Sequence, residues 1–122
     1  ILCYPVITSG EYAHKGSFKA LLGDKYEELL DFVSLENQVG DQTPPTFIWH
    51  TFEDSSVPLE NTLLYINAMK KHRVPMEVHI YPRGRHGLSL ANYETQSVNG
   101  GSTIVAECQN WIQMAGTWIK NF

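Results

Sequence analysis

The chain has 122 residues, of which 43% are hydrophobic and 18% are charged, a composition typical of a globular protein. Its formal net charge is −4, and its largest basic cluster is the short run Lys70-Lys71-His72-Arg73, so nothing indicates a nucleic-acid surface. The apolar stretches fall far short of the roughly 18 residues that a membrane span needs. We therefore expect neither nucleic acid nor a membrane as a partner.

The chain begins inside an apolar run, Ile1-Leu-Cys-Tyr-Pro-Val-Ile-Thr8, which is typical of a strand. No initiator Met, polar lead-in or signal-peptide pattern precedes it, and we interpret residue 1 as an internal edge of a longer protein. Because nearly every position from Leu2 to Ile7 is apolar, this strand is predicted to be buried on both faces of a sheet and to have another strand along each of its edges. Because an unpaired edge attracts other chain segments, the expected partners are a missing N-terminal half or a second copy in a homo-oligomer.

Residues 10–39 show helical patterns with breaks. Asp24 is followed three positions later by Glu27, the spacing of a capped helix start, and Ser34 is placed to cap a second short helix. Residues 10–39 are longer than the single helix that is needed to connect two parallel strands. We therefore expect residues 10–39 to form a cap-like helical insertion near the carboxyl edge of the sheet, where α/β folds bind ligands, although packing alone would equally explain them.

Strand and helix patterns alternate along the rest of the chain. Residues 46–51 and 76–81 are predicted strands, and residues 58–72 and 103–120 are predicted helices. The first of these helices places Leu59, Leu63, Ile66 and Met69 on one face, and the second has a broad apolar face formed by Cys108, Trp111, Ile112, Ala115, Trp118, Ile119 and Phe122. This alternation predicts an α/β fold in which helices cover a parallel sheet, with residues 1–122 as one structural unit.

Two candidate catalytic residues, Asp54 and His86, follow the second and third predicted strands. Loops at the carboxyl ends of parallel strands meet at one edge of a sheet, so we expect the two side chains to lie together. An imidazole accepts the proton of a serine nucleophile, and a carboxylate bonded to its other nitrogen fixes its tautomer. Glu53 is a competing acid, Asp54 could be an ordinary loop acid, and His86 alone could be merely solvated.

The motifs around these residues resemble a known superfamily. Asp54-Ser-Ser-Val-Pro58 leads into a helix, and a strand ending in Tyr81-Pro82 is followed by Gly84-Arg-His86-Gly87. This pattern resembles the distal half of the α/β-hydrolase esterases and lipases. The stretches His86-Gly-Leu-Ser-Leu-Ala91 and Asn61 to Tyr65 look most like the acetylesterase and acetylxylan-esterase-like group.

The resemblance implies that Asp54 and His86 are the acid and the base of a Ser-His-Asp triad. It also implies an acyl-enzyme reaction on a short acyl ester, such as acetyl groups on a small sugar. A Gly-x-Ser-x-Gly motif is absent from the 122 residues, so the serine and the oxyanion hole would precede Ile1. A prolyl-oligopeptidase-like peptidase, a dienelactone-hydrolase-like enzyme and a non-catalytic binding module that has lost the nucleophile remain open.

Other residues give weaker signals. His50 ends a strand and is predicted to be a core histidine or one that supports the site. His14, His72 and His79 share no metal-ligand spacing, and Asn99 to Ser102 is predicted to be a loop rather than a phosphate cradle, so we expect no metal or cofactor. The tryptophans are predicted to pack in the core. Cys3 and Cys108 are predicted to be free thiols, which favours a cytoplasmic protein.

Overall fold

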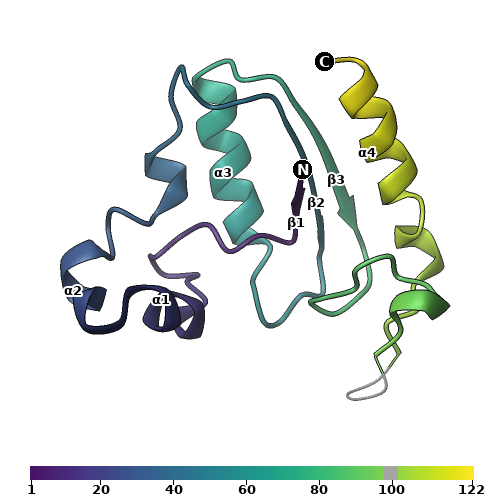
Figure 1. The fold of residues 1–122 in the computed structure, drawn as a ribbon, viewed down its shortest axis with the longest axis horizontal. Helices are drawn as coiled ribbons and strands as arrows, with labels where there is room; N and C mark the ends of the chain where they lie inside the picture. The colour runs from purple at the N-terminus through teal and green to yellow at the C-terminus, as the bar shows by residue number, and fades with distance from the viewer. Residues whose placement is uncertain (98–101) are drawn as a thin grey trace.

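The computed structural model describes residues 1–97 and 102–122. Residues 98–101, which include most of the predicted loop from Asn99 to Ser102, lie outside the described part. Three parallel strands form the sheet in the order β1-β2-β3: β1 is Leu2–Cys3, β2 is Thr46–Thr51 and β3 is Met76–Tyr81. Helix α3, Glu60–Lys71, covers one face of the sheet, and helix α4, Trp111–Lys120, covers the other (Figure 1).

Strand β2 is the centre of the fold. It pairs with β3 along its whole length, from Thr46 opposite Met76 to Thr51 opposite Tyr81, and with β1 through Ile48 and Trp49. All six of its residues are buried, as a central strand with helices on both faces requires. The predicted bounds of β2 and β3 are confirmed. The predicted α/β fold with a parallel sheet is confirmed as well.

The first predicted strand is much shorter in the structure than residues 1–8. Tyr4 has a φ of 38°, a left-handed conformation that ends the extended pairing. Pro5 has no N–H to donate, and the N–H groups of Ile7 and Thr8 bond to the Oδ1 atom of Asn61 at 2.9 and 3.0 Å. The apolar pattern could not reveal that a side chain from α3 takes the place of a strand partner.

The insertion between β1 and β2 contains α1, Lys15–Leu22, a 3-10 turn at Gly23–Lys25, α2, Tyr26–Leu29, and a second 3-10 turn at Leu35–Asn37. A helix does begin close to the predicted start at Asp24, but it is the short α2, which begins at Tyr26 after the 3-10 turn and has no side-chain cap. The longer helix α1 begins at Lys15 and is capped by His14, whose Nδ1 atom accepts from the N–H of Ser17 at 3.3 Å. Ser34 precedes the second turn, but its hydroxyl donates to Glu36 instead of capping.

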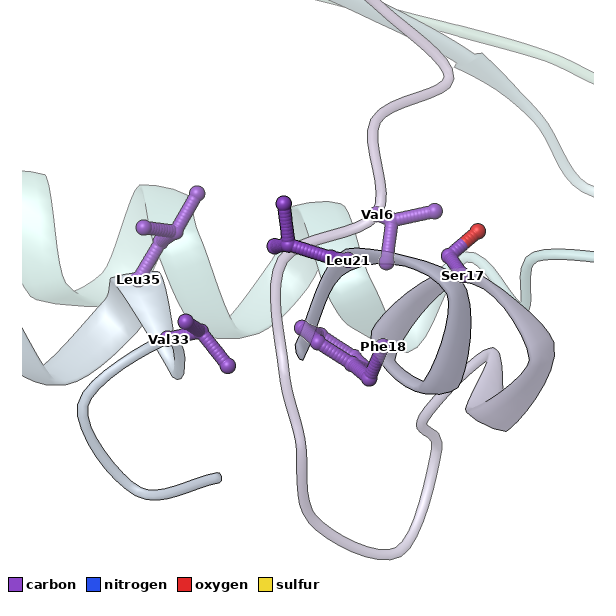
Figure 2. A pocket seen from close by; sticks show the side chains of 6 residues that line it. All are labelled: Val6, Ser17, Phe18, Leu21, Val33 and Leu35. Atoms are coloured by element: carbon purple, nitrogen blue, oxygen red, sulfur yellow. The ribbon is translucent and has the colours of Figure 1, made fainter. Parts of the chain in front are cut away.

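An apolar pocket of about 210 Å³ lies between the chain that follows β1 and this insertion (Figure 2). Its lining residues are Val6, Ser17, Phe18, Leu21, Val33 and Leu35. Five of these six side chains are hydrocarbon. The pocket therefore offers packing surface and little chemistry.

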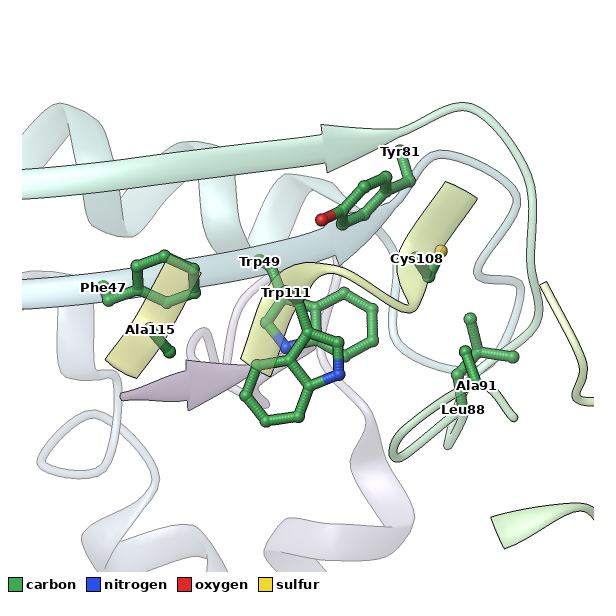
Figure 3. Packing of buried hydrophobic residues seen from close by; sticks show 8 residues of the cluster. All are labelled: Phe47, Trp49, Tyr81, Leu88, Ala91, Cys108, Trp111 and Ala115. Atoms are coloured by element: carbon green, nitrogen blue, oxygen red, sulfur yellow. The ribbon is translucent and has the colours of Figure 1, made fainter. Parts of the chain in front are cut away.

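The main core lies between β2 and α4, where the rings of Trp49 and Trp111 stack at 5.4 Å with an interplanar angle of 26° (Figure 3). The prediction that these tryptophans belong to the core is confirmed. Helix α4 begins at Trp111 rather than at residue 103, because the chain before it forms a 3-10 turn at Ala106–Cys108. Its packed face is narrower than predicted, since Ile112, Ile119 and Phe122 are exposed.

On the other face of the sheet, α3 buries Met69, as predicted, together with two polar side chains, Asn61 and Thr62. Leu63, which the helical spacing placed on the inner face, is exposed. These polar side chains face inwards because they have buried hydrogen-bond partners there. Asn61 accepts the N–H groups of Ile7 and Thr8, in the chain that follows β1, and Thr62 bonds to His50 in β2. Within the described residues, no helix is long and apolar enough to cross a membrane.

Candidate active site

Asp54 and His86 meet at the carboxyl edge of the sheet. Asp54 follows β2, His86 follows β3, and the Nδ1 atom of His86 lies 2.7 Å from the Oδ2 atom of Asp54. The carboxylate is fully buried, whereas the imidazole side chain keeps 33% of its surface exposed. The buried carboxylate of Asp54 therefore occupies Nδ1 of His86, and Nε2 is the ring nitrogen that this contact leaves available.

The rest of the Asp54 carboxylate is also bonded. Its Oδ1 atom accepts the backbone N–H groups of Ser56 at 3.0 Å and Val57 at 2.9 Å, and its Oδ2 atom also lies 3.2 Å from the Nε2 atom of His50. Burial alone raises the pKa of Asp54, but the hydrogen bonds from His50, Val57 and His86 and the charge of His86 outweigh it and lower the pKa to about 2. Asp54 is thus an ionised acceptor at neutral pH.

His50 supports this carboxylate from within the core. It is fully buried, its Nε2 atom lies 2.9 Å from the carbonyl oxygen of Val57, and its Nδ1 atom lies 2.8 Å from the hydroxyl of Thr62. The neutral tautomer with the proton on Nε2 satisfies every contact, since Nε2–H faces Val57 and Asp54 and the hydroxyl of Thr62 donates to Nδ1. The structure agrees with the prediction of a supporting histidine.

The loop that carries His86 is tied to its surroundings on both sides of the imidazole. The hydroxyl of Thr51 donates to the carbonyl of Gly84 at 2.7 Å, and the N–H of Gly84 donates to the carboxylate of Glu53 at 3.2 Å. Beyond the imidazole, the indole N–H of Trp111 donates to the carbonyl of Ser89 at 2.8 Å. Glu53, the competing acid, thus anchors this loop, while Asp54 is the carboxylate that reaches His86.

Gly84 is required by the turn itself. Its φ is 126°, and a Cβ atom at this position would lie 2.7 Å from the Cδ1 atom of Leu88 and 3.2 Å from the Cγ2 atom of Thr51. Only glycine combines this backbone conformation with so close an approach. A side chain at position 84 is therefore excluded both by the backbone conformation and by its neighbours.

Tyr4 is a residue of the site that sequence reasoning missed. Its ring packs against the imidazole of His86 with centroids 4.8 Å apart, and its hydroxyl accepts the N–H of Ser89 at 3.1 Å. In an apolar run it looked like any core aromatic. Its position at the carboxyl end of a strand, one place before a proline, was the available signal.

The apolar pocket shares no lining residue with this pair. Among residues 1–97 and 102–122, no group of three or more His, Cys, Asp or Glu side chains is arranged to hold a metal. Both cysteines are free thiols. Burial, followed by the charge of Glu107, raises the pKa of Cys108 to about 11, so this thiol is a poor nucleophile at neutral pH.

The model of the prolyl oligopeptidase family matches residues 4–101. The chain belongs to the prolyl oligopeptidase family. A stretch of 95 residues, 77% of the chain, is 52% identical to endo-1,4-beta-xylanase B of Butyrivibrio fibrisolvens, although the match covers only 15% of that protein.

Solved structures of this family are similar over nearly the whole chain. The acetyl ester-xyloside bifunctional hydrolase of Caldicellulosiruptor lactoaceticus is 46% identical with a TM-score of 0.83, and the match covers 99% of this chain and 41% of that one. The carboxylesterase Cest-2923 of Lactobacillus plantarum WCFS1 is 28% identical with a TM-score of 0.77, covering 99% and 43%. The chain spans about two-fifths of these relatives, over a C-terminal part of the α/β-hydrolase fold. The predicted resemblance is confirmed, and the chain is homologous to carboxylesterases and acetyl esterases.

Proposed function

We propose that Asp54 and His86 are the acid and the base of a Ser-His-Asp triad in a carboxylic ester hydrolase, and that the serine lies in the same protein outside residues 1–122. The observation that carries the proposal is the 2.7 Å contact between His86 Nδ1 and a buried, ionised carboxylate. That contact leaves Nε2 as the nitrogen that exchanges protons with a nucleophile.

In this mechanism, Nε2 of His86 removes the proton from the serine hydroxyl as the serine oxygen attacks the ester carbonyl. The tetrahedral intermediate expels the alkoxide, which receives that proton from Nε2, and an acyl-enzyme remains. A water molecule then attacks the acyl group by the same proton route and releases the acid. Asp54 stays ionised throughout and stabilises the imidazolium each time it forms.

We propose a short acyl ester as the substrate, with acetyl groups on a small sugar or a xylo-oligosaccharide as the preferred class. The names of two relatives support this class, since one is an acetyl ester-xyloside hydrolase and the other a xylanase. The helical insertion at residues 10–39 would form a cap beside the site. Two free thiols support a cytoplasmic location.

A peptidase is the second candidate, because the family model that matches the chain is named for prolyl oligopeptidases. The two candidates share the Asp54–His86 pair and differ in the bond that is broken. A dienelactone hydrolase would use the same pair on a lactone. A binding module would keep the pair but lack a serine to activate.

The test compares substrates and variants in the full-length protein. We expect hydrolysis of p-nitrophenyl acetate and acetylated xylo-oligosaccharides, and little cleavage of a proline p-nitroanilide. His86→Ala and Asp54→Asn should each lower kcat by about 10³-fold or more. His72→Ala, which removes an exposed imidazole, should leave kcat unchanged.

Three results would redirect the assignment. Faster cleavage of the proline amide would make the protein a peptidase, and faster opening of a lactone would favour the dienelactone-type enzyme. A full-length sequence without Gly-x-Ser-x-Gly, together with no turnover, would favour a binding module. Unchanged ester hydrolysis in His86→Ala would refute the proposed base.

A further inference from the structure

We propose that Tyr4 is a positioning residue that holds the imidazole of His86 in its reactive orientation; the proposal rests on the proposed ester hydrolase function. Two contacts carry it. The ring of Tyr4 lies edge-to-face against the imidazole, with centroids 4.8 Å apart and planes at 72°, and its hydroxyl accepts the N–H of Ser89 at 3.1 Å. One side chain thus contacts both the imidazole and the backbone three residues beyond it.

Tyr4 is itself fixed by the core. Its backbone N–H donates to the carbonyl of Trp49 at 2.7 Å, and its ring packs edge-to-face on the indole of Trp49 with centroids 5.0 Å apart. Trp49 is fully buried in the central strand and stacks on Trp111. Tyr4 therefore connects the buried core at Trp49 to the imidazole.

The backbone at both ends of this connection is strained. Tyr4 has a φ of 38° and Ser89 a φ of 53°, a region in which side chains larger than glycine are unfavourable. Such conformations persist only where the surrounding structure enforces them, and they concentrate at functional sites. The hydrogen bond between the Tyr4 hydroxyl and the Ser89 N–H joins these two strained residues directly.

Asp54 alone does not determine where the free nitrogen of His86 points. The hydrogen bond holds the ring at Nδ1 only, so small changes in the side-chain torsions of His86 can still tilt the ring, and one-third of the side chain is open to solvent. The ring of Tyr4 packs against the imidazole and limits this tilt on one side. Because a misplacement of about 1 Å can lower a rate by roughly 10²-fold, such a restraint bears directly on kcat.

Tyr81 provides a matched control within the same core. It also packs edge-to-face on Trp49, with centroids 5.8 Å apart, and its hydroxyl also makes a hydrogen bond, donating to Asn110 at 2.8 Å. Its aromatic ring pairs are with Trp49 and His79, and none is with the imidazole of His86. Tyr81 is buried in the core cluster and Tyr4 is only partly buried beside it, so substitutions at Tyr81 disturb the core at least as much but leave the imidazole untouched.

The experiment uses the full-length protein with Tyr4→Phe, Tyr4→Leu, Tyr81→Phe and Tyr81→Leu, assayed well below each melting temperature. Tyr4→Leu should lower kcat for p-nitrophenyl acetate about 10- to 100-fold, with KM within about 2-fold. Tyr4→Phe should lower kcat about 3-fold and speed exchange of the Ser89 amide. Both Tyr81 variants should keep kcat within about 2-fold of the wild type.

A second readout reports on the imidazole itself. The His86 Nδ1–H proton, identified by its loss in His86→Ala, should give a low-field NMR signal that broadens in Tyr4→Leu and stays sharp in Tyr81→Leu. Equal kcat and equal NMR signals in Tyr4→Leu and Tyr81→Leu would show that Tyr4 is only a core residue. If Tyr4→Leu does not fold, an unchanged kcat and Ser89 exchange rate in Tyr4→Phe would overturn the proposal. If the wild type hydrolyses no ester, the proposed function fails, and the NMR comparison still decides the role of Tyr4.

Discussion

His50 and Asp54 lie four residues apart at the end of β2, and both side chains are buried, with Nε2 of His50 3.2 Å from Oδ2 of Asp54. The same carboxylate oxygen receives His86. Asp54 is therefore held between a histidine that belongs to the core and a histidine that faces solvent. The partly exposed pair depends on a buried polar network that also includes Thr62 and Val57.

Replacing His50 by Phe should destabilise the chain by about 2 to 3 kcal/mol, because Asp54, Thr62 and the carbonyl of Val57 each lose a buried partner. Urea unfolding measures this loss. His72→Phe, at an exposed position, should change the unfolding free energy by less than about 0.5 kcal/mol. Equal stability of the two variants would show that the buried network contributes nothing.

The acid stability of the fold should depend on Asp54. Its folded-state pKa is lowered from 3.8 to about 2, so ionised Asp54 stabilises the fold above about pH 4, and this contribution is lost as the pH falls towards 2. The difference corresponds to about 2 kcal/mol of unfolding free energy. The stability gap between the wild type and Asp54→Asn should narrow as unfolding is measured from pH 5 down to about pH 2. A constant gap would contradict the lowered pKa.

Gly84→Ala should destabilise the chain by about 1 to 3 kcal/mol, because the added methyl group meets Leu88 and Thr51 and the backbone φ is positive. Gly116→Ala is the control, since a Cβ atom there meets nothing within 4 Å and Gly116 lies within α4. That change should stabilise the helix by up to about 1 kcal/mol. Thermal unfolding should therefore shift in opposite directions for the two variants.

Asn61→Leu should cost about 3 kcal/mol or more, since the fully buried amide makes four hydrogen bonds. Its Oδ1 atom accepts from Ile7 and Thr8, and its Nδ2 atom donates to the carbonyls of Tyr12 and Pro58 at 2.9 and 3.0 Å. Asn61→Asp should also destabilise, because a carboxylate would face both carbonyls. Asn37→Leu, at an exposed site, is the control in urea unfolding, and a loss as large there would refute the argument.

The sequence predicted best what depends on local pattern and topology. Strands β2 and β3 have the predicted bounds because β2 has an apolar centre and β3 alternates apolar and polar residues, and Asp54 meets His86 because the loops after parallel strands lie at one edge of the sheet. The early end of β1 was not predictable, since it depends on the amide of Asn61, 54 residues from Ile7. The role of Tyr4 was hidden for the same reason, because its partners are assembled only by folding.

The indole N–H of Trp111, the first residue of α4, donates to the carbonyl of Ser89. Helix α4 therefore both covers the sheet and is hydrogen-bonded to the loop that carries His86. Changes along α4 that shift its axis slightly would be transmitted to His86 without altering any residue of the two loops. For the proposed hydrolase, substitutions that change the reaction rate should therefore be found along α4 as well as beside Asp54 and His86.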